Sequence, residues 1–229
     1  MGRAALWWTL DYVWAGLVWI STLFAPARPD HYAAGSGRAV VVLPGVYENW
    51  QFLRPLIVPL HRRGYAVHVV TALGHNRRPI EDGASAVLEF LAARDLRDVV
   101  LVGHSKGGLV GKLALLGDAD HRIAALVTIC APFHGSSRAR LLPLPSVAPL
   151  VPGHPSLARL GGPDPVNALI TSVGTSFDEH VPEGSGLPGA RNVRVAASGH
   201  FSPLGHPSVL TEVVRAIDRT SPAPPGDGS

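Results

Sequence analysis

The stretch VVLVGHSKGG, residues 99–108, decides the fold class of this chain. Residues 99–102 have the composition of a buried strand, and they run directly into the pentapeptide GHSKG at 103–107. Apolar residues at helical spacing follow from Leu109. This order of strand, G-x-S-x-G and helix predicts a strained turn that lifts the Ser105 hydroxyl above a sheet as a nucleophile. The alternative is a glycine-rich turn in which Ser105 merely caps the helix.

On both sides of this turn, strand-like and helix-like segments alternate. Strands are predicted at Ala39–Leu43, Tyr65–Thr71, Val99–Val102, Ile123–Cys130, Val166–Val173 and Asn192–Ala197. Helices are predicted at Gln51–Arg63, Ile80–Ala93 and Ser208–Arg219, and directly after the G-x-S-x-G turn. Strands separated by helices of this length indicate right-handed crossovers. The predicted fold class is therefore α/β, with a mainly parallel central sheet flanked by helices.

Composition narrows the function classes. The 229 residues, 46% of them hydrophobic, suffice for one sizeable α/β core. A formal net charge of +3 without any long basic run argues against a nucleic-acid partner. The single cysteine, Cys130, excludes an intramolecular disulfide. Neither a phosphate-binding loop nor a metal-ligand motif occurs, so we expect no cofactor and no metal.

The N-terminal stretch, residues 4–25, is apolar and holds four of the five tryptophans. A transmembrane anchor fits its length, but Asp11 near its middle would cost about 2.5–3.5 kcal/mol there. A cleaved signal peptide fits the Ala-Pro-Ala sequence at 25–27. A helix docked on the domain or on lipid headgroups fits the spacing of the tryptophans. The three interpretations stay open, and the localisation (membrane-associated, cytoplasmic or secreted) stays open with them.

Domain organisation follows from these patterns. We expect residues 1–28 to form an apolar N-terminal helix, residues 29–220 the α/β domain, and residues 221–229 a disordered tail. Residues 134–165 interrupt the alternation with a segment rich in proline and leucine that is long for a simple connection. We interpret this insertion as a short cap or lid over the site. The alternative is an irregular surface excursion packed by its own leucines.

A serine nucleophile needs a histidine base and a carboxylate, and in this fold they follow the serine in the order acid, then histidine. Asp178 lies a few residues past the predicted strand at 166–173, where the acid belongs. Its neighbour Glu179 is disfavoured, because a strand-end loop normally turns only one of two neighbours inward. His200 is the first histidine after the next strand, whereas His206 is placed at the start of the last helix.

The oxyanion of an acyl intermediate needs two backbone donors. We expect them to be the N–H groups of Lys106, which follows the serine, and of Val46, in the loop after the first strand. The Lys106 side chain has three interpretations: it steers anionic substrates, it pairs with a carboxylate of the insertion, or it points into solvent. His104, His134 and His154 are interpreted as packing or surface residues.

Several of these segments together resemble the α/β-hydrolase superfamily, on its lipase and esterase side. They are the LPGV, GHSKGG and TICAPFHGSS segments (43–46, 103–108 and 128–137) and the loops GTSFDEHVP and SGHFSPLGHP (174–182 and 198–207). The resemblance covers Arg38 to Arg219. The chain departs from the common pattern at Pro44, Lys106 and Phe133, and these departures leave the substrate less well defined than the reaction. The resemblance implies hydrolysis of a carboxylic ester, with a lipid or another apolar acyl ester as substrate.

Two alternatives to ester hydrolysis remain. The same triad in a site that excludes water would make the chain an acyltransferase, and a hydrolase fold can also serve as a non-catalytic binding protein. The expected partner is a small-molecule or lipid ester, with a membrane surface as a second partner of the N-terminal helix. On that interpretation, removing the helix should reduce membrane association more than turnover of short soluble esters. The sequence leaves the oligomeric state open.

Overall fold

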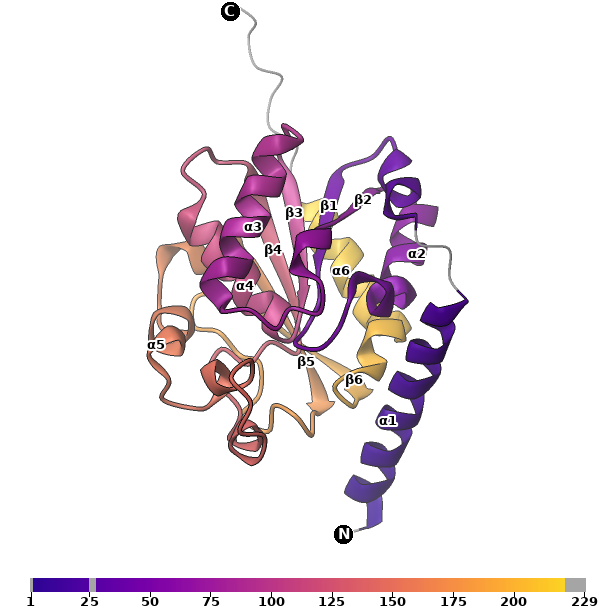
Figure 1. The fold of residues 1–229 in the computed structure, drawn as a ribbon, viewed down its shortest axis with the longest axis vertical. Coiled ribbons are helices and arrows are strands. Elements are labelled where there is room, and N and C mark those ends of the chain that lie inside the picture. Colours follow the sequence, from indigo (N-terminus) through magenta and orange to yellow (C-terminus); the bar gives the residue numbers. More distant parts are fainter. Residues whose placement is uncertain (1, 25–27, 221–229) are drawn as a thin grey trace, which may run out of the picture.

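The computed structural model of the chain describes residues 2–24 and 28–220. Its strands form one six-stranded parallel sheet in the order β2-β1-β3-β4-β5-β6 (Figure 1). The strands are β1 (Ala39–Leu43), β2 (Ala66–Val69), β3 (Val99–His104), β4 (Ile123–Ile129), β5 (Ile170–Phe177) and β6 (Arg191–Ser198). The α-helices are α1 (Gly2–Leu23), α2 (Arg54–Arg62), α3 (Ile80–Ala93), α4 (Lys106–Gly117), α5 (Pro155–Gly161) and α6 (Pro207–Arg219). The predicted α/β class with its parallel sheet is confirmed.

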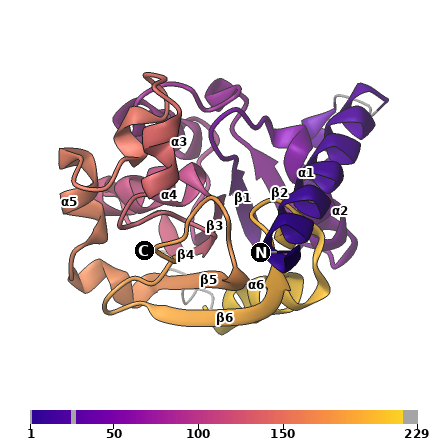
Figure 2. The same ribbon diagram turned by 90° about the horizontal axis from the view of Figure 1, so that it is seen from below.

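Both faces of the central strands are buried, which explains why these strands are almost purely apolar in sequence. Successive side chains of β1 alternate between the faces: Val40 and Val42 pack with α2 and α6, and Val41 and Leu43 with α3 and α4. Figure 2 shows the two helical layers on either side of the sheet. The sheet therefore divides the core into two clusters, one on each face. The predicted site residues lie on neither face, because they follow the carboxyl-terminal ends of the strands.

One predicted strand is wrong in its first half. Residues Pro165–Leu169 form a 3-10 helix, and β5 begins only at Ile170. The reason is local: the Asp164 carboxylate accepts a hydrogen bond from the Val166 N–H (2.9 Å), and Pro165 occupies the first helical position. Apolar residues alone do not distinguish such a capped turn from a buried strand. Strand β5 also ends later than predicted, at Phe177, so Asp178 follows it directly.

Helix α1 packs along the same side of the sheet as α2 and α6 (Figure 1). Its inward side chains recur at helical spacing, and they are Asp11, Trp14, Ala15, Val18, Trp19 and Thr22. The Trp19 ring lies 5.5 Å from the Phe52 ring, between ring centroids. Across residues 2–24 and 28–220, no helix combines the length and the apolarity that crossing a membrane requires. The predicted cleavage sequence at 25–27 and the predicted tail at 221–229 lie outside the described residues.

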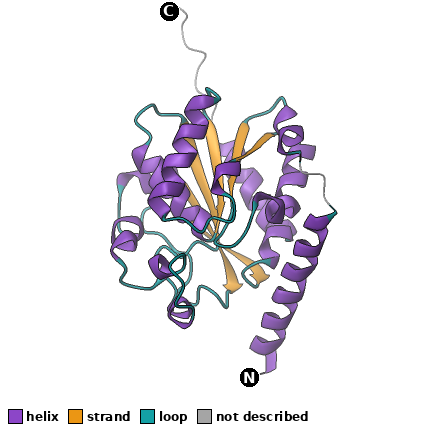
Figure 3. Ribbon diagram, viewed as in Figure 1, coloured by secondary structure: helices purple, strands orange, loops and turns teal. Residues whose placement is uncertain are grey.

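The insertion, residues 134–165, consists of loops and short helices between β4 and β5 (Figure 3). Its 3-10 segments are Ser137–Leu141 and Ala148–Leu150, and α5 follows them. Val147 and Leu150 are buried, whereas Leu141 and Leu142 are exposed. The insertion thus packs partly on its own leucines and also presents apolar side chains to solvent.

Candidate active site

The predicted site residues all follow the carboxyl ends of parallel strands, which is where α/β sheets place their sites. Val46 follows β1, Ser105 follows β3, Asp178 follows β5 and His200 follows β6. Because these strands are neighbours or near neighbours in the sheet, their loops meet at one edge (Figure 2). The separate sequence segments therefore come together.

Ser105 occupies a strained backbone conformation, with φ 50° and ψ −122°. The glycines on either side make this turn sterically feasible. A Cβ on Gly103 would lie 2.6 Å from backbone atoms of Gly107, and a Cβ on Gly107 would lie 2.2 Å from the Leu43 carbonyl oxygen. A non-glycine residue held at positive φ by its surroundings is typical of a functional position. The geometry is that of a nucleophile turn and not of an ordinary helix cap.

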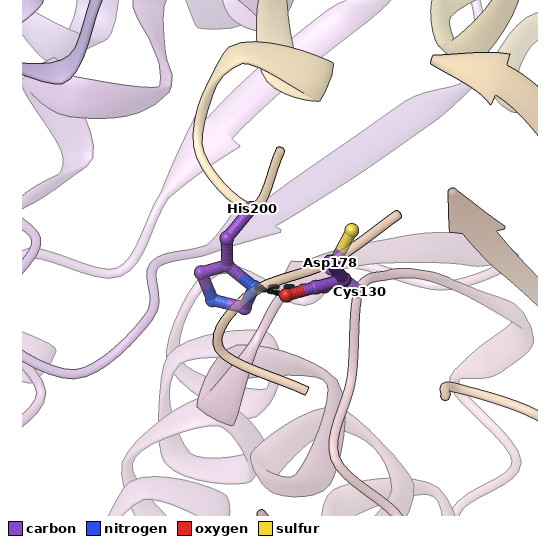
Figure 4. A group of neighbouring side chains, drawn as sticks. All are labelled: Cys130, Asp178 and His200. Carbon is purple, nitrogen blue, oxygen red and sulfur yellow. Dashed lines mark hydrogen bonds and ion pairs between the residues drawn. The ribbon is translucent and has the colours of Figure 1, made fainter. Parts of the chain in front are cut away.

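Asp178 and His200 form a buried pair (Figure 4). The His200 Nδ1 lies 3.0 and 3.1 Å from the two carboxylate oxygens. Burial alone would raise the pKa of Asp178, but His200 and the backbone N–H groups of His180 and Val181 lower it below its ordinary value. The carboxylate is therefore ionised and accepts from the Nδ1–H, which leaves the His200 Nε2 as the basic nitrogen.

Ser105 and His200 line the same cavity, of about 220 Å³. Its other walls come from the loop after β1, from the insertion and from the loops after β4, β5 and β6, and its lining includes Val46, Tyr47, Pro132, Ser136, Arg138, Ala139, Leu142, Val147, Leu150, His180 and Phe201. A larger cavity, of about 610 Å³, lies against β5 and β6 but is lined by neither Ser105 nor His200. We therefore place the candidate site at the smaller of these two cavities, which holds both groups.

The loop after β1 has one N–H group suited to an oxyanion. The Gly45 N–H donates to the Glu48 carboxylate (2.7 Å) and the Tyr47 N–H to the His75 carbonyl (2.8 Å). The Glu48 N–H donates back to Gly45, and within the described residues the Val46 N–H has no hydrogen-bond partner. Val46 also lines the cavity. Of the two predicted donors, Val46 thus lines the cavity together with Ser105, and Lys106 is the first residue of α4, directly after Ser105.

His104 is not the simple packing residue that its sequence position indicated. Its Nδ1 lies 2.9 Å from the Glu48 carboxylate, and its Nε2 lies 2.9 Å from the His200 carbonyl oxygen. Burial by itself would lower the pKa of His104, but Glu48 outweighs it and the pKa is raised. Both ring nitrogens thus lie within hydrogen-bonding distance of oxygen atoms from other loops. Because Glu48 also holds Gly45, His104 connects the oxyanion loop to the histidine loop.

The Lys106 side chain matches none of its three interpretations. It is fully buried, and its ammonium donates to the carbonyls of Asn76 (3.0 Å) and Arg78 (2.6 Å). Burial lowers its pKa to about 8. The carbonyls belong to the loop between β2 and α3, so this lysine anchors a neighbouring loop. Sequence could not show this, because a lysine is rarely fully buried and its carbonyl partners carry no sequence signal.

The loop after β5 also differs from expectation. Asp178 and Glu179 both turn inward, and Glu179 is only 2% exposed. Burial raises the pKa of Glu179 to about 8, assisted by the neighbouring Asp11. The next residue, His180, lines the cavity, and its Nε2 lies 3.0 Å from the Tyr12 hydroxyl. Burial and His200 lower the pKa of His180 to about 4, so its ring is neutral at pH 7.

Cys130 lies behind the Asp178–His200 pair (Figure 4). Its sulfur, an Asp178 oxygen and a His200 nitrogen lie within 4.8 Å of one another, which is a spacing that a metal ion could use. The Asp178–His200 hydrogen bond already employs two of the three groups, however. Burial and Asp178 raise the pKa of the thiol well above its ordinary value, which disfavours the thiolate that metals bind. We interpret the trio as a carboxylate–histidine pair with a neighbouring thiol.

The comparisons with known proteins agree with this architecture. A model of the alpha/beta hydrolase family matches residues 40–183, and the chain belongs to that family. A carbendazim-hydrolysing esterase from Nocardioides sp. (strain SG-4G) is 33% identical over 116 residues, which cover 45% of this chain and 46% of that protein. The chain thus matches less than half of this curated relative.

Solved structures show the same fold at low identity. Lipase B of Aspergillus fumigatus has a TM-score of 0.68 at 16% identity, over 86% of this chain and 56% of that one. A metagenomic carboxyl esterase has a TM-score of 0.60 at 17% identity, over 80% and 76%. The mature form of a Bacillus licheniformis lipase has a TM-score of 0.58 at 16% identity, over 83% and 94%.

Proposed function

We propose that this chain is a serine hydrolase that cleaves carboxylic esters through an acyl-enzyme. The observation that carries the proposal is the shared cavity of Ser105, at its strained turn, and His200, whose Nδ1 is held by Asp178. Membership of the alpha/beta hydrolase family and the esterase relative support the same reaction class. A binding protein would have no need of a strained serine beside an oriented base.

In the proposed mechanism, the Ser105 hydroxyl attacks the acyl carbonyl while the His200 Nε2 takes its proton. Asp178 stays ionised and stabilises the imidazolium. The N–H groups of Val46 and Lys106 stabilise the oxyanion, and each such donor contributes roughly 10²–10³ in rate. His200 then protonates the leaving alcohol, and the acyl-enzyme forms. Water attacks this ester with His200 as base, which releases the acid and restores Ser105.

The cavity favours a single apolar acyl chain. Its insertion wall carries Ala139, Leu142, Val147 and Leu150, and Phe201 faces them from the histidine loop. Its volume of about 220 Å³ is below the roughly 300–1,000 Å³ of sites for drug-sized ligands. We therefore propose esters with one unbranched apolar acyl group as substrates.

The first experiment is labelling with an organophosphonate probe followed by mass spectrometry, together with turnover of p-nitrophenyl esters of graded chain length. We expect an adduct on Ser105, and we expect Ser105→Ala to lose both labelling and turnover. Ser137→Ala, which changes an exposed serine of the insertion, should keep both. A folded wild-type chain that shows neither adduct nor turnover would refute the proposal. Acyl transfer to an added alcohol at the expense of free acid would identify the acyltransferase instead.

We further propose that the outer face of α1 rests on a lipid surface. Leu6, Leu10, Val13, Leu17 and Ile20 form one stripe along it, and each is 48–62% exposed. The one acidic residue of α1, Asp11, is buried on the opposite face. At its N-terminal end, α1 adjoins the insertion, because the Arg138 guanidinium lies 6.0 Å from the Trp8 ring centroid. Between residues 4 and 24 this face carries no charged side chain, and a face of this kind, with tryptophan at its end and next to the exposed insertion leucines, suits a membrane interface.

Flotation with vesicles of phosphatidylcholine and phosphatidylglycerol tests this second proposal. Wild type should float with the vesicles, and Leu17→Glu should reduce binding at least tenfold. Thr211→Glu adds the same charge on the exposed face of α6 and should bind like wild type. A wild-type chain that does not float, but forms a dimer that Leu17→Glu dissociates, would assign the face to a second copy and overturn the lipid proposal.

A further inference from the structure

Helix α1 contributes a buried carboxylate to the loop that carries His200. Asp11 is 1% exposed. Its carboxylate accepts hydrogen bonds from three consecutive backbone N–H groups, those of His200 (3.1 Å), Phe201 (3.0 Å) and Ser202 (2.8 Å). It also accepts from the Ser202 hydroxyl at 2.6 Å. A single side chain therefore holds the histidine loop from a position 189 residues earlier in the chain.

The carboxylate is present in its charged form. Burial would raise the pKa of Asp11, but Glu179, Ser202 and the loop N–H groups lower it below its ordinary value. Gly199 makes room for it: this residue has φ 105°, and a Cβ there would lie 2.2 Å from the Asp11 Oδ1. Hydrogen bonds from N–H groups to a charged acceptor are about twice as strong as neutral ones. Asp11 thus holds the histidine loop through charged hydrogen bonds, in a space that only glycine at position 199 leaves open.

The peptide units around His200 are held from two sides. The His200 N–H donates to Asp11, and its carbonyl oxygen accepts from His104. The side chain is held separately by Asp178. With both backbone groups and the Nδ1 constrained, the position and orientation of the His200 ring are set. Of the three residues that make these contacts, His104 and Asp178 lie within residues 40–183, which the family model matches. Asp11 lies outside that segment, in α1.

We propose that Asp11 is a positioning residue for His200, so that α1 forms part of the catalytic machinery. This inference rests on the proposed ester hydrolysis, since His200 is the base of that reaction. It reverses the expectation that removal of the N-terminal helix spares the turnover of short soluble esters. Displacing Asp11 would free three N–H groups of the loop and let His200 drift. A shift of about 1 Å in a catalytic group is enough to cost about 10²-fold in rate.

The test compares Asp11→Asn and Asp11→Ala with Val18→Ala in the full chain. Val18 is buried on the same face of α1 but makes no contact with the loop's N–H groups, so its truncation loosens helix packing alone. The measurements are kcat and KM for p-nitrophenyl acetate, the rate at which the phosphonate probe labels Ser105, and the melting temperature. We expect Asp11→Asn to lower kcat and the labelling rate about 10- to 100-fold, with KM changed less than threefold. Val18→Ala should lower the melting temperature without this loss.

Two kinetic results would overturn the role of Asp11. One is a kcat for Asp11→Asn within twofold of wild type, and the other is an equal loss of kcat in Val18→Ala at a matched loss of melting temperature. An NMR readout works without turnover: the downfield Nδ1–H proton of His200 should be seen in wild type and in Val18→Ala but broaden in Asp11→Asn. If wild type does not react with the probe, the proposed function fails. An unchanged His200 proton in Asp11→Asn would then refute the positioning role separately.

Discussion

We expect Glu179 to make the stability of this protein fall as the pH rises through the neutral range. Its carboxyl group is buried beside Asp11, and its pKa is raised from 4.5 to about 8. Between these two values, the folded chain holds a proton that the unfolded chain has released. A group of this kind stabilises fully below pH 4.5, and its contribution is lost as the pH rises to about 8.

The magnitude follows from the shift. Each pH unit in this window costs about 1.4 kcal/mol for one group, so the pKa change sets an upper bound of about 5 kcal/mol between the two ends. Relaxation around the charge reduces this figure. Glu179→Gln removes the titration and keeps the shape of the side chain. We expect the variant to match wild type near pH 5 and to exceed it by several kcal/mol at pH 8.

Urea unfolding at pH 5, 6, 7 and 8 measures the difference in unfolding free energy between the two proteins, in which all other titrations cancel. Glu183→Gln is the matched control: Glu183 is exposed, and its hydrogen bonds with Ser137 lower its pKa despite partial burial. It is ionised in both states above pH 5, so its difference should stay flat. A flat difference for Glu179→Gln, or one in which wild type gains with rising pH, would show that Glu179 is ionised in the native state.

Three further substitutions test the site and its support. Asp178→Asn should lower kcat by roughly 10²–10⁴ with little change in the melting temperature, because the base loses its orientation; a loss below tenfold in steady-state kinetics would contradict that role. Lys106→Met should lower the unfolding free energy by about 1–3 kcal/mol in urea titrations, since two loop carbonyls lose their donor, and an unchanged stability would refute the anchoring role. Gly107→Ala should abolish the fold or lower the unfolding free energy by more than about 3 kcal/mol, because its Cβ would overlap a backbone carbonyl. Gly117→Ala, at the end of the same helix, is the control: its unfolding free energy, followed by circular dichroism, should stay within about 1 kcal/mol of wild type.

Much of the site could be predicted because its signals are local. The G-x-S-x-G turn requires glycines within two residues of Ser105, and the acid and histidine follow the ends of strands that the sequence predicts. The strand at 166–173 shows where this reasoning fails: a capped 3-10 turn and a strand share the same apolar composition. The orientation of Glu179 failed for a related reason, since its burial depends on Asp11, which approaches from a distant helix.

The roles of Asp11, His104 and Lys106 could not be read from the sequence. Each acts through backbone N–H or carbonyl groups of a remote loop, and backbone groups carry no residue-specific signal. In the sequence, Asp11 only indicates that a membrane-spanning helix would be destabilised. Its hydrogen bonds with the N–H groups of residues 200–202 show why a carboxylate stands in this apolar helix. His104 likewise contacts Glu48 and the His200 carbonyl, which belong to two loops that are far apart in the chain.

The sequence by itself determined the α/β class, the order of strands and helices along the chain, and the G-x-S-x-G turn with its candidate nucleophile, acid and base, because hydrophobic period and turn sterics act over a few residues. Only the tertiary structure decided which side chains hold those groups in place. The reason is physical: the parallel sheet gathers loops that are far apart in the chain at one edge, and hydrogen bonds there depend on distances that no local pattern encodes.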